Sequence, residues 1–205
     1  MVQQPLYQLG SSAAVLLPLL LIFKEMKNKG EEINIRLAEI SDAQAILKIY
    51  NEAVTGSTVT FDIVPRSLEE QITWLEEHRG VYPAIVAAQN SNQPGSHPDN
   101  SQNNIVGFGA LSPYRQRPAY ATSVEDSVYV TSNCQATGIG KMILNELITL
   151  GRQHGFHTIV AHMESGNNAS IRLHQSCGFK VVGTEKEVGR KFTKWLDITI
   201  MQLML

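Results

Sequence analysis

Apolar and polar residues follow two different periods along this chain, and these periods predict its strands and helices. Strict alternation predicts strands, as do the short apolar runs at 84–88 and 105–111, which are typical of buried strands, whereas apolar residues three or four positions apart predict amphipathic helices. The predicted strands cover residues 33–37, 84–88, 105–111, 124–130, 157–163, 180–187 and 194–203. The predicted helices cover residues 43–53, 68–75, 139–150 and 168–177. The resulting order, β-α-α-β-β-β-α-β-α-β-β, indicates a mixed α+β domain rather than a strictly alternating α/β fold.

Two of the predicted helices carry recognisable start signals. Ser41 or Asp42 is expected to cap the first helix, and Ser67 with Glu70 gives the Ser-x-x-Glu spacing of a capping box. The second helix is expected to turn a short set of apolar side chains inward, namely Leu68, Ile72 and Leu75.

Residues 89–104 separate two predicted strands and contain no bulky apolar side chain. Asn, Gln, Ser, Pro, Gly, Asp and His make up most of this stretch, so nothing in it can drive burial. We expect a flexible hairpin loop inserted at the surface.

The N-terminal stretch has a different character. Residues 13–23 form an apolar run that Pro18 interrupts and that lysines follow. The run is about half of the ~20 residues that a membrane-spanning helix needs, and a secretory signal would carry positive charge before it. We expect residues 1–30 to be a dispensable extension outside the fold, with Met26 as a candidate for the true start. Weak membrane association is the alternative.

The stretch from 123 to 146 combines a strand, a polar turn with two glycines and a helix. Alternation places Val124, Asp126, Val128 and Val130 on one face of the strand and Glu125, Ser127 and Tyr129 on the other. The first N–H groups of a helix lack intrahelical partners, so a glycine turn at this point is a ready anion site. An ordinary strand-to-helix connection is the alternative.

Composition narrows the class of protein. The chain has 205 residues, 43% apolar and 18% charged, which fits one globular domain. Its formal net charge of −2 gives no basic field for nucleic acid, so no nucleic-acid partner is expected. Two cysteines are too few for a disulfide framework, which suits a cytoplasmic location, and the histidines lack the spacing of metal ligands.

Several motifs resemble one enzyme family. The segment Gln135-Ala136-Thr137-Gly138-Ile139-Gly140 fits the (Arg/Gln)-x-x-Gly-x-(Gly/Ala) signature of the GCN5-related N-acetyltransferases, called GNAT below. The chain is most similar to the phosphinothricin acetyltransferase subgroup, and the likeness extends from about residue 33 to residue 203. The segments that carry it are Gly56–Phe61, Arg115-x-Arg117-x-Ala119-Tyr120, Glu125–Val130, His154-Gly155-Phe156, Asn167–Ser170 and His174-x-x-Cys177-Gly178-Phe179.

The resemblance implies a fold and a cofactor. The fold would be a three-layer α/β/α domain over residues 33–205, with a mixed, mostly antiparallel sheet whose central strand is splayed from its neighbour. The co-substrate would be acetyl-CoA, with no metal, and the chain would form a homodimer. The residues that the resemblance assigns to acetyl-CoA are Val128, Tyr129, Val130, Gln135, Ala136, Thr137, Gly138, Ile139, Gly140, Lys141, Asn167 and Ser170.

The resemblance also assigns catalytic and substrate roles. Glu125 would help to remove a proton from the amine, although an exposed, ion-paired strand carboxylate is the alternative. His174 would give a proton to the leaving thiolate, where many GNAT enzymes have Tyr, and simple packing is the alternative. The acceptor site would be formed by Phe61, Arg115, Arg117 and Tyr120.

Together these features predict an acetyl-CoA-dependent N-acetyltransferase. Its acceptor would be the α-amine of a small amino-acid-like molecule such as phosphinothricin, methionine sulfoximine or methionine sulfone. Two alternatives remain: an acetyltransferase for another amine, such as a protein N-terminus or a polyamine, and a non-catalytic acyl-CoA-binding module.

Overall fold

The computed structural model describes residues 24–28, 31–89 and 104–205, and the strands among them form one eight-stranded sheet. In chain order these are β1 (Lys24–Asn28), β2 (Glu31–Leu37), β3 (Ala84–Gln89), β4 (Asn104–Pro113), β5 (Ser123–Val130), β6 (Thr158–Glu164), β7 (Lys180–Lys191) and β8 (Lys194–Met204). Across the sheet the order is β1-β2-β3-β4-β5-β6-β8-β7. Within this described sheet β5 and β6 pair in parallel and the other neighbours pair antiparallel, as predicted.

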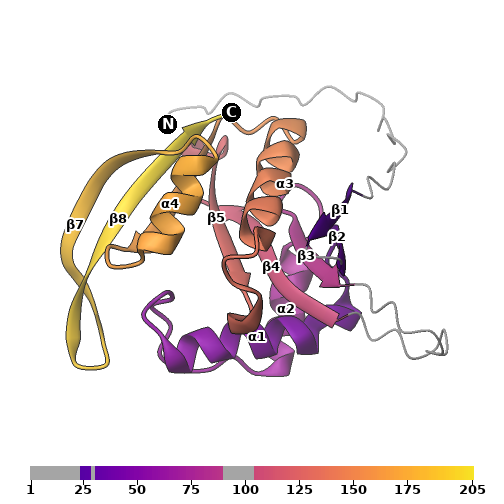
Figure 1. The fold of residues 1–205 in the computed structure, drawn as a ribbon. Helices are drawn as coiled ribbons and strands as arrows, with labels where there is room; N and C mark the ends of the chain where they lie inside the picture. Colours follow the sequence, from indigo (N-terminus) through magenta and orange to yellow (C-terminus); the bar gives the residue numbers. More distant parts are fainter. Residues whose placement is uncertain (1–23, 29–30, 90–103) are drawn as a thin grey trace, which may run out of the picture.

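Helices cover both faces of the sheet and give it three layers (Figure 1). One face packs against α1 (Ala43–Gly56) and α2 (Leu68–Glu77), and the other packs against α3 (Ile139–Gln153) and α4 (Asn168–Ser176). The β-α-α-β-β-β-α-β-α-β-β order is confirmed from β2 onward. β7 and β8 form a long hairpin at one edge of the sheet.

One predicted boundary is wrong. Residues 24–28 lie within the stretch expected to be outside the fold, yet they form β1, an edge strand that pairs antiparallel with β2. Its sequence, Lys-Glu-Met-Lys-Asn, has one apolar residue and therefore no alternation to detect. Main-chain pairing with β2 defines this strand. Residues 1–23 lie outside the described residues.

The loop between β3 and β4 is described only at its two ends. Gln89 and Asn104 are paired in the ladder, and the Asn104 side-chain amide donates to Gln89 Oε1 at 3.1 Å. The antiparallel hairpin predicted here is therefore confirmed. Residues 90–103, the interior of the expected insertion, lie outside the described residues.

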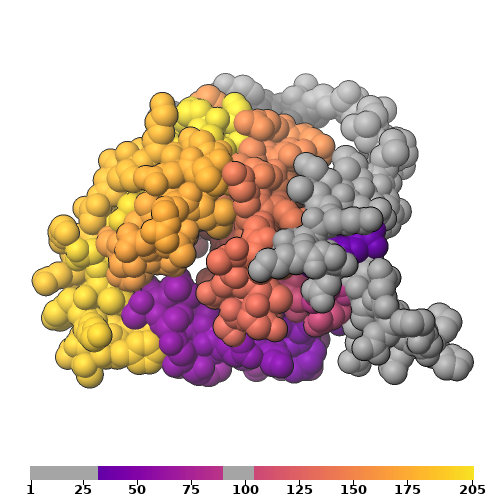
Figure 2. Space-filling model, viewed as in Figure 1, coloured from indigo at the N-terminus to yellow at the C-terminus, as the bar shows by residue number. Residues whose placement is uncertain are grey.

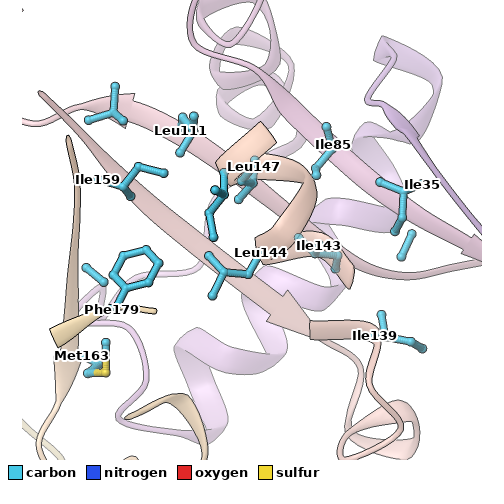
Figure 3. Close-up of a cluster of buried hydrophobic side chains, with 14 of the residues drawn as sticks. Ile35, Ile85, Leu111, Ile139, Ile143, Leu144, Leu147, Ile159, Met163 and Phe179 are labelled. Atoms are coloured by element: carbon cyan, nitrogen blue, oxygen red, sulfur yellow. The ribbon is translucent and has the colours of Figure 1, made fainter. Parts of the chain in front are cut away.

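The apolar stripe of α3 forms the larger core. Ile143, Leu144 and Leu147 are fully buried against the sheet, where they meet Leu111 and Ile159 (Figure 3). This is the helical spacing seen in the sequence, and it fixes α3 across the middle strands. The N-terminus of α3 is thereby held next to the end of β5.

Aromatic rings dominate the core on the opposite face. Tyr129 of β5 stacks on Phe108 of β4 with ring centroids 5.0 Å apart, and Tyr50 of α1 meets Tyr129 edge-on at 5.3 Å. Trp74 of α2 meets Phe108 edge-on at 6.1 Å. Side chains of alternate β5 residues thus enter different cores, as the alternation predicts.

The helix starts agree only in part with the sequence. The capping box is confirmed, since Ser67 accepts from the Glu70 amide at 3.2 Å and Glu70 accepts from the Ser67 amide at 2.7 Å. Asp42 precedes α1 but does not cap it, because its carboxylate takes two bonds from Arg36 at 2.7 and 2.8 Å. Leu68, expected inward, is exposed because it lies in the first turn of α2.

The sheet opens between β5 and β6. β5 pairs with β4 from Val124 to Val130, but its pairing with β6 ends at Glu125, opposite Val160. Beyond Glu125 the two strands separate, and the main chain of β5 from 126 to 130 has no ladder partner on that side among the described strands. The splayed central strand is therefore confirmed.

Candidate active site

A pocket of about 490 Å³ lies where β5 and β6 separate. Its walls come from residues 125–129 of β5, residues 161–164 of β6, residues 59–61 after α1, the start of α4, and parts of β7 and β8. Figure 2 shows the surface hollowed between the orange region of α4 and the purple region of α1 and the loop that follows it. Segments far apart in the sequence thus meet at the gap in the sheet.

Carboxylates dominate the ionisable lining of this pocket. Glu125, Asp126, Glu164 and Glu185 all contribute to its surface. The cationic or potentially cationic side chains in the same lining are histidines, at positions 162 and 174. Such a wall attracts a cation, because a negative potential in a partly enclosed cleft is less screened than in bulk water.

Glu125 stands on the pocket wall with a histidine partner. Its Oε1 lies 3.0 Å from Nδ1 of His162, and 38% of the Glu125 side chain is exposed. The hydrogen bond with Glu125 raises the pKa of His162 above its ordinary value, and this outweighs the opposite effect of partial burial. Glu125 is therefore both accessible and paired, so the catalytic prediction and its ion-paired alternative describe the same side chain.

His162 was missed in the sequence, where a lone histidine without ligand spacing carries no signal. Its ring lies parallel to Tyr114, with centroids 6.0 Å apart and planes 7° from each other. Tyr114 belongs to the segment after β4 that also holds Arg115. The pairing with Glu125 depends on the register of β5 against β6, which the sequence does not reveal.

His174 is buried and bonded through both ring nitrogens. Its Nε2 lies 3.0 Å from Oδ2 of Asp126, and its Nδ1 lies 2.8 Å from the main-chain oxygen of Ser170. A carboxylate and a carbonyl oxygen both accept, so this arrangement favours a ring that is protonated at both nitrogens. Burial alone lowers the pKa of His174, but the bond and charge of Asp126 and the bond to Ser170 raise it overall.

Asp126 was not assigned a role from the sequence, although a signal was present. Alternation placed this acid on the same strand face as three valines, and a buried position of that kind needs a partner. The structure supplies His174 as that partner, with Asp126 only 7% exposed.

This pair predicts a pH-dependent stability. Because the pKa of His174 is raised in the folded chain, the contribution is fully present below the unfolded value of about 6.5 and is lost as pH rises through the folded value. Asp126→Asn should lower the free energy of unfolding by about 2 kcal/mol at pH 5.5 and by clearly less at pH 9. Urea denaturation at both pH values measures this.

The control for that measurement is a chain without the titrating ring. In a His174→Gln background, the loss of stability that Asp126→Asn causes at pH 5.5 should disappear, because no imidazolium remains for the carboxylate to pair with. An effect of Asp126→Asn that is the same at both pH values with His174 in place would show that the pair is not charged in the folded protein.

The turn before α3 has the geometry of an anion site. Gly138 is the N-cap at φ +96°, and its carbonyl accepts from the amides of Lys141 and Met142 at 3.0 and 3.1 Å. The amides of Ile139 and Gly140 therefore precede the first intrahelical bonds of α3. A Cβ at Gly138 would meet nothing within 4 Å, so the space beside this glycine is open.

Gly140 has a different reason to be small. A Cβ there would lie 3.3 Å from Leu173 of α4 and 3.8 Å from Val130 of β5. The glycine lets α3, α4 and the end of β5 approach closely. The two glycines of the motif thus serve local backbone geometry and helix packing, respectively.

The residues assigned to acetyl-CoA fall into two groups. Some line the pocket: Val128, Tyr129, Asn167 and Ser170. The others, Val130 and residues 135–141, lie outside its lining, at the end of β5 and the start of α3. Gln135 donates to the Val130 carbonyl at 3.5 Å, and Asn167 caps α4 by accepting from the Ser170 amide at 3.1 Å.

Of the four residues assigned to the acceptor site, only one lines the pocket. Phe61 lines the pocket, and its ring lies directly against Gly189 of β7, where a Cβ would collide with it. Arg115 is exposed, with its guanidinium 5.0 Å from the ring centre of Tyr114 and 5.7 Å from that of Tyr120. Arg115, Arg117 and Tyr120 do not line the pocket.

Lys191 holds one wall of the pocket and was missed in the sequence. Its Nζ donates to the main-chain oxygen of Thr60 at 2.8 Å, and the residue is only 5% exposed. Together with the contact between Phe61 and Gly189, this bond fastens the loop after α1 to β7. A lysine near a hairpin tip gives no sequence sign of such a role.

No cluster of three or more His, Cys, Asp or Glu side chains is placed to hold a metal ion among the residues that the structure describes. Nor does any helix among them combine the length and the apolar content that crossing a bilayer requires.

Known proteins resemble this chain over nearly its whole length. A family model described as an acetyltransferase (GNAT) domain matches residues 35–200. An L-methionine sulfoximine/L-methionine sulfone acetyltransferase from Pseudomonas paraeruginosa is 36% identical over 173 residues, which is 84% of this chain and 94% of that protein. A phosphinothricin N-acetyltransferase from Streptomyces coelicolor is 36% identical over 169 residues, covering 82% and 93% of the two chains.

A solved structure agrees with the sequence relatives. A putative acetyltransferase from Salmonella typhimurium, determined with its cofactor acetyl-CoA, superimposes with a TM-score of 0.76 at 35% identity, over 84% of this chain and 94% of that one. The family model, the relatives and the splayed sheet all lead to the same assignment: this chain belongs to the GNAT family of acetyltransferases.

Proposed function

We propose that this protein transfers the acetyl group of acetyl-CoA to the α-amine of a small amino-acid-like acceptor of the phosphinothricin, methionine sulfoximine or methionine sulfone type. The observation that carries the proposal is the carboxylate-lined pocket at the separation of β5 and β6, with Glu125 exposed on its wall. The names of the relatives support the same acceptor class.

The turn before α3 fits the diphosphate of acetyl-CoA. Its amides precede the helical hydrogen bonds, and the space in front of Gly138 is open. Residues 135–141 would hold the diphosphate, while Asn167, whose side-chain oxygen is taken by the helix cap, would donate from its amide nitrogen to the pantetheine arm. Unpaired main chain of β5 between 128 and 130 would orient that arm and donate to the thioester oxygen. Acetyl-CoA supplies an acyl group activated as a thioester.

The acceptor would enter with its ammonium group toward the carboxylates. An α-amine has a pKa of about 8 and is largely protonated at neutral pH, so it must lose a proton before it can attack. Glu125 is the accessible carboxylate for this step, with 38% of its side chain exposed. The other end of a zwitterion carries a carboxylate. Arg115 would attract it from outside the pocket lining, since its charge acts on two pocket-lining groups, His162 and Glu185. Phe61 would contact the side chain of the acceptor; Arg117 and Tyr120 would support Arg115.

His174 is proposed as the proton donor to the leaving thiolate. As an imidazolium it carries the proton that this role needs. Both ring nitrogens are bonded within the protein, so the bond to Asp126 or to Ser170 has to open for the proton to leave. The structure therefore gives His174 a role in holding Asp126 in addition to the proposed acid role.

We further propose that the protein is a cytoplasmic homodimer, as the family resemblance implies. Exposed apolar side chains on β7, on β8 and in the turn between them, among them Val182, Phe192 and Trp195, offer a surface that a second copy would cover. Analytical ultracentrifugation decides this, and a monomer at micromolar concentration would contradict it.

A thiol-release assay tests the proposed reaction. Acetyl-CoA is incubated with the protein and with methionine sulfone, methionine sulfoximine, phosphinothricin, a peptide with a free N-terminus, or a polyamine, and free CoA is followed with a thiol reagent. Release with the first three acceptors supports the proposal. Release only with the peptide or the polyamine changes the acceptor class, and CoA binding without release for every acceptor indicates a binding module.

A further inference from the structure

The Glu125–His162 pair lies at the point where the sheet opens. Glu125 is the last β5 residue paired with β6, opposite Val160, and His162 is two residues further along β6 on the same face. The two side chains are therefore diagonal cross-strand neighbours, and Glu125 Oε1 lies 3.0 Å from His162 Nδ1. Beyond them the strands separate, so the pair borders the pocket.

Both members of the pair are held in place and both remain accessible. The His162 ring lies parallel to Tyr114 at 6.0 Å, which restrains its plane. The exposed fractions of the side chains are 25% for His162 and 38% for Glu125. Both residues line the pocket, so a ligand that reaches Glu125 also lies close to the imidazole.

Charged side chains on three segments affect the protonation of His162. Glu125 on β5 and Glu185 on β7 favour the imidazolium, and Arg115, after β4, opposes it. Tyr114 faces the ring as a neutral partner. Because the carboxylates prevail, the imidazole holds a proton more strongly than a solvated histidine does.

We propose that His162 acts together with Glu125 as one proton-accepting pair for the acceptor's ammonium group. The inference rests on the proposed acetyl transfer and adds a residue to it. In the productive state Glu125 is a carboxylate and the ring is neutral, with Nδ1–H donated to Glu125 Oε1 and the lone pair on Nε2. The ammonium N–H bond breaks and leaves its electron pair on nitrogen. The proton passes to the free oxygen of the Glu125 carboxylate. Glu125 then gives a proton to water and Nε2 takes one up, so the pair ends as carboxylate and imidazolium and later returns the proton to water.

The sharing of the proton between Glu125 and His162 makes the activity depend on pH. When the ring is already an imidazolium, the pair holds its proton and cannot take another from the acceptor. The wild type should therefore lose activity as pH falls through the raised pKa of His162. With Asn at position 162, the amide can still donate to Glu125 but does not titrate, and only protonation of Glu125 itself remains to stop the reaction.

The test compares kcat/KM of wild type and His162→Asn from pH 5.5 to pH 9 with methionine sulfone. The ionisation of the acceptor is the same for both enzymes, so the ratio of variant to wild type reports the protein alone. We expect the variant to be about tenfold slower at pH 8, and we expect this deficit to shrink steadily toward pH 5.5. His157→Asn, an exposed residue just before β6, is the matched control and should follow the wild type throughout.

A second readout does not depend on turnover. The imidazole of His162 is titrated by NMR in the wild type and in Glu125→Gln. We expect its pKa to lie above that of a solvated histidine in the wild type and to fall in Glu125→Gln.

The outcomes separate this inference from the proposed function. A constant ratio of His162→Asn to wild type across the pH range would show a merely structural role and overturn the pair, even with full acetyl transfer by the wild type. A His162 titration unchanged by Glu125→Gln would overturn it as well. Absence of turnover by the wild type with every acceptor would instead overturn the proposed function, and the pair's role in it.

Discussion

Replacing Glu125 by Gln is expected to lower kcat by about 10²–10⁴-fold at pH 8, the range typical of losing a general base. The amide keeps the shape of the side chain but cannot take a proton. Binding of acetyl-CoA should be unchanged, because Glu125 is not among the residues assigned to acetyl-CoA and the proposed diphosphate site at residues 135–141 lies outside the pocket lining. Steady-state kinetics with methionine sulfone, together with calorimetric titration of CoA, measure both quantities.

The matched control is Glu76→Gln on α2, which removes the same charge from an exposed position outside the pocket. It should keep the kcat of the wild type. If Glu125→Gln kept it too, Glu125 would be an ordinary strand carboxylate and proton removal would have to be assigned elsewhere in the pocket.

The second large effect is expected at the turn before α3. Gly138→Val should weaken the binding of acetyl-CoA by roughly 100-fold, about 3 kcal/mol, through the loss of charge-assisted bonds from the α3 amides to phosphate. Gly138 has φ +96°, which a β-branched residue resists, and its missing Cβ faces open space from which a phosphate would approach. Isothermal titration calorimetry gives the dissociation constant directly.

Backbone strain alone has to be separated from the loss of a binding surface. Gly80→Val provides the comparison, since Gly80 has φ +86° and equally open surroundings but lies in the loop after α2. Both variants should lose a similar amount of thermal stability, and only Gly138→Val should lose affinity. Equal affinity in both variants would remove the α3 turn from the cofactor site.

Most of the fold could be predicted from the sequence, because the strands and helices that form its layers show the hydrophobic periodicity of their own secondary structure. Side chains on β5 alternate between two cores, so Val124 packs under α3 while Tyr129 packs under α1. The stripe of α3 is equally regular, and Ile143 and Leu147 are buried where helical spacing puts them. In these elements burial of one face determines the structure, and the positions of the apolar residues in the sequence indicate which face is buried.

Prediction failed where main-chain bonds or helix ends decide the structure. β1 is bound to the sheet edge by its backbone, and its residues show no period. Leu68 has the spacing of an inward residue but lies in the first turn of α2, where Gln71 is buried instead. Asp42 has the type and position of a cap, yet the nearby Arg36 takes its carboxylate.

The sequence predicts the motif of the candidate site but not which of its side chains pair with one another. The glycine turn and Glu125 could be found from local sequence and family resemblance. The partners could not: His162 and His174 reach Glu125 and Asp126 only through strand register and the packing of α4 over the sheet. A residue-by-residue resemblance names positions, whereas the structure shows that two adjacent acids on β5 face opposite sides and take different histidines.

Isotope labelling tests the central claim most directly. The protein is incubated with acetyl-CoA carrying ¹³C at the acetyl carbonyl and with methionine sulfone carrying ¹⁵N at its α-amine, and the product is examined by NMR. We expect a carbonyl signal split by a one-bond coupling to ¹⁵N, which only a new amide at the α-nitrogen can give. A label that remains in the thioester, or that appears as free acetate without such a coupling, would contradict it.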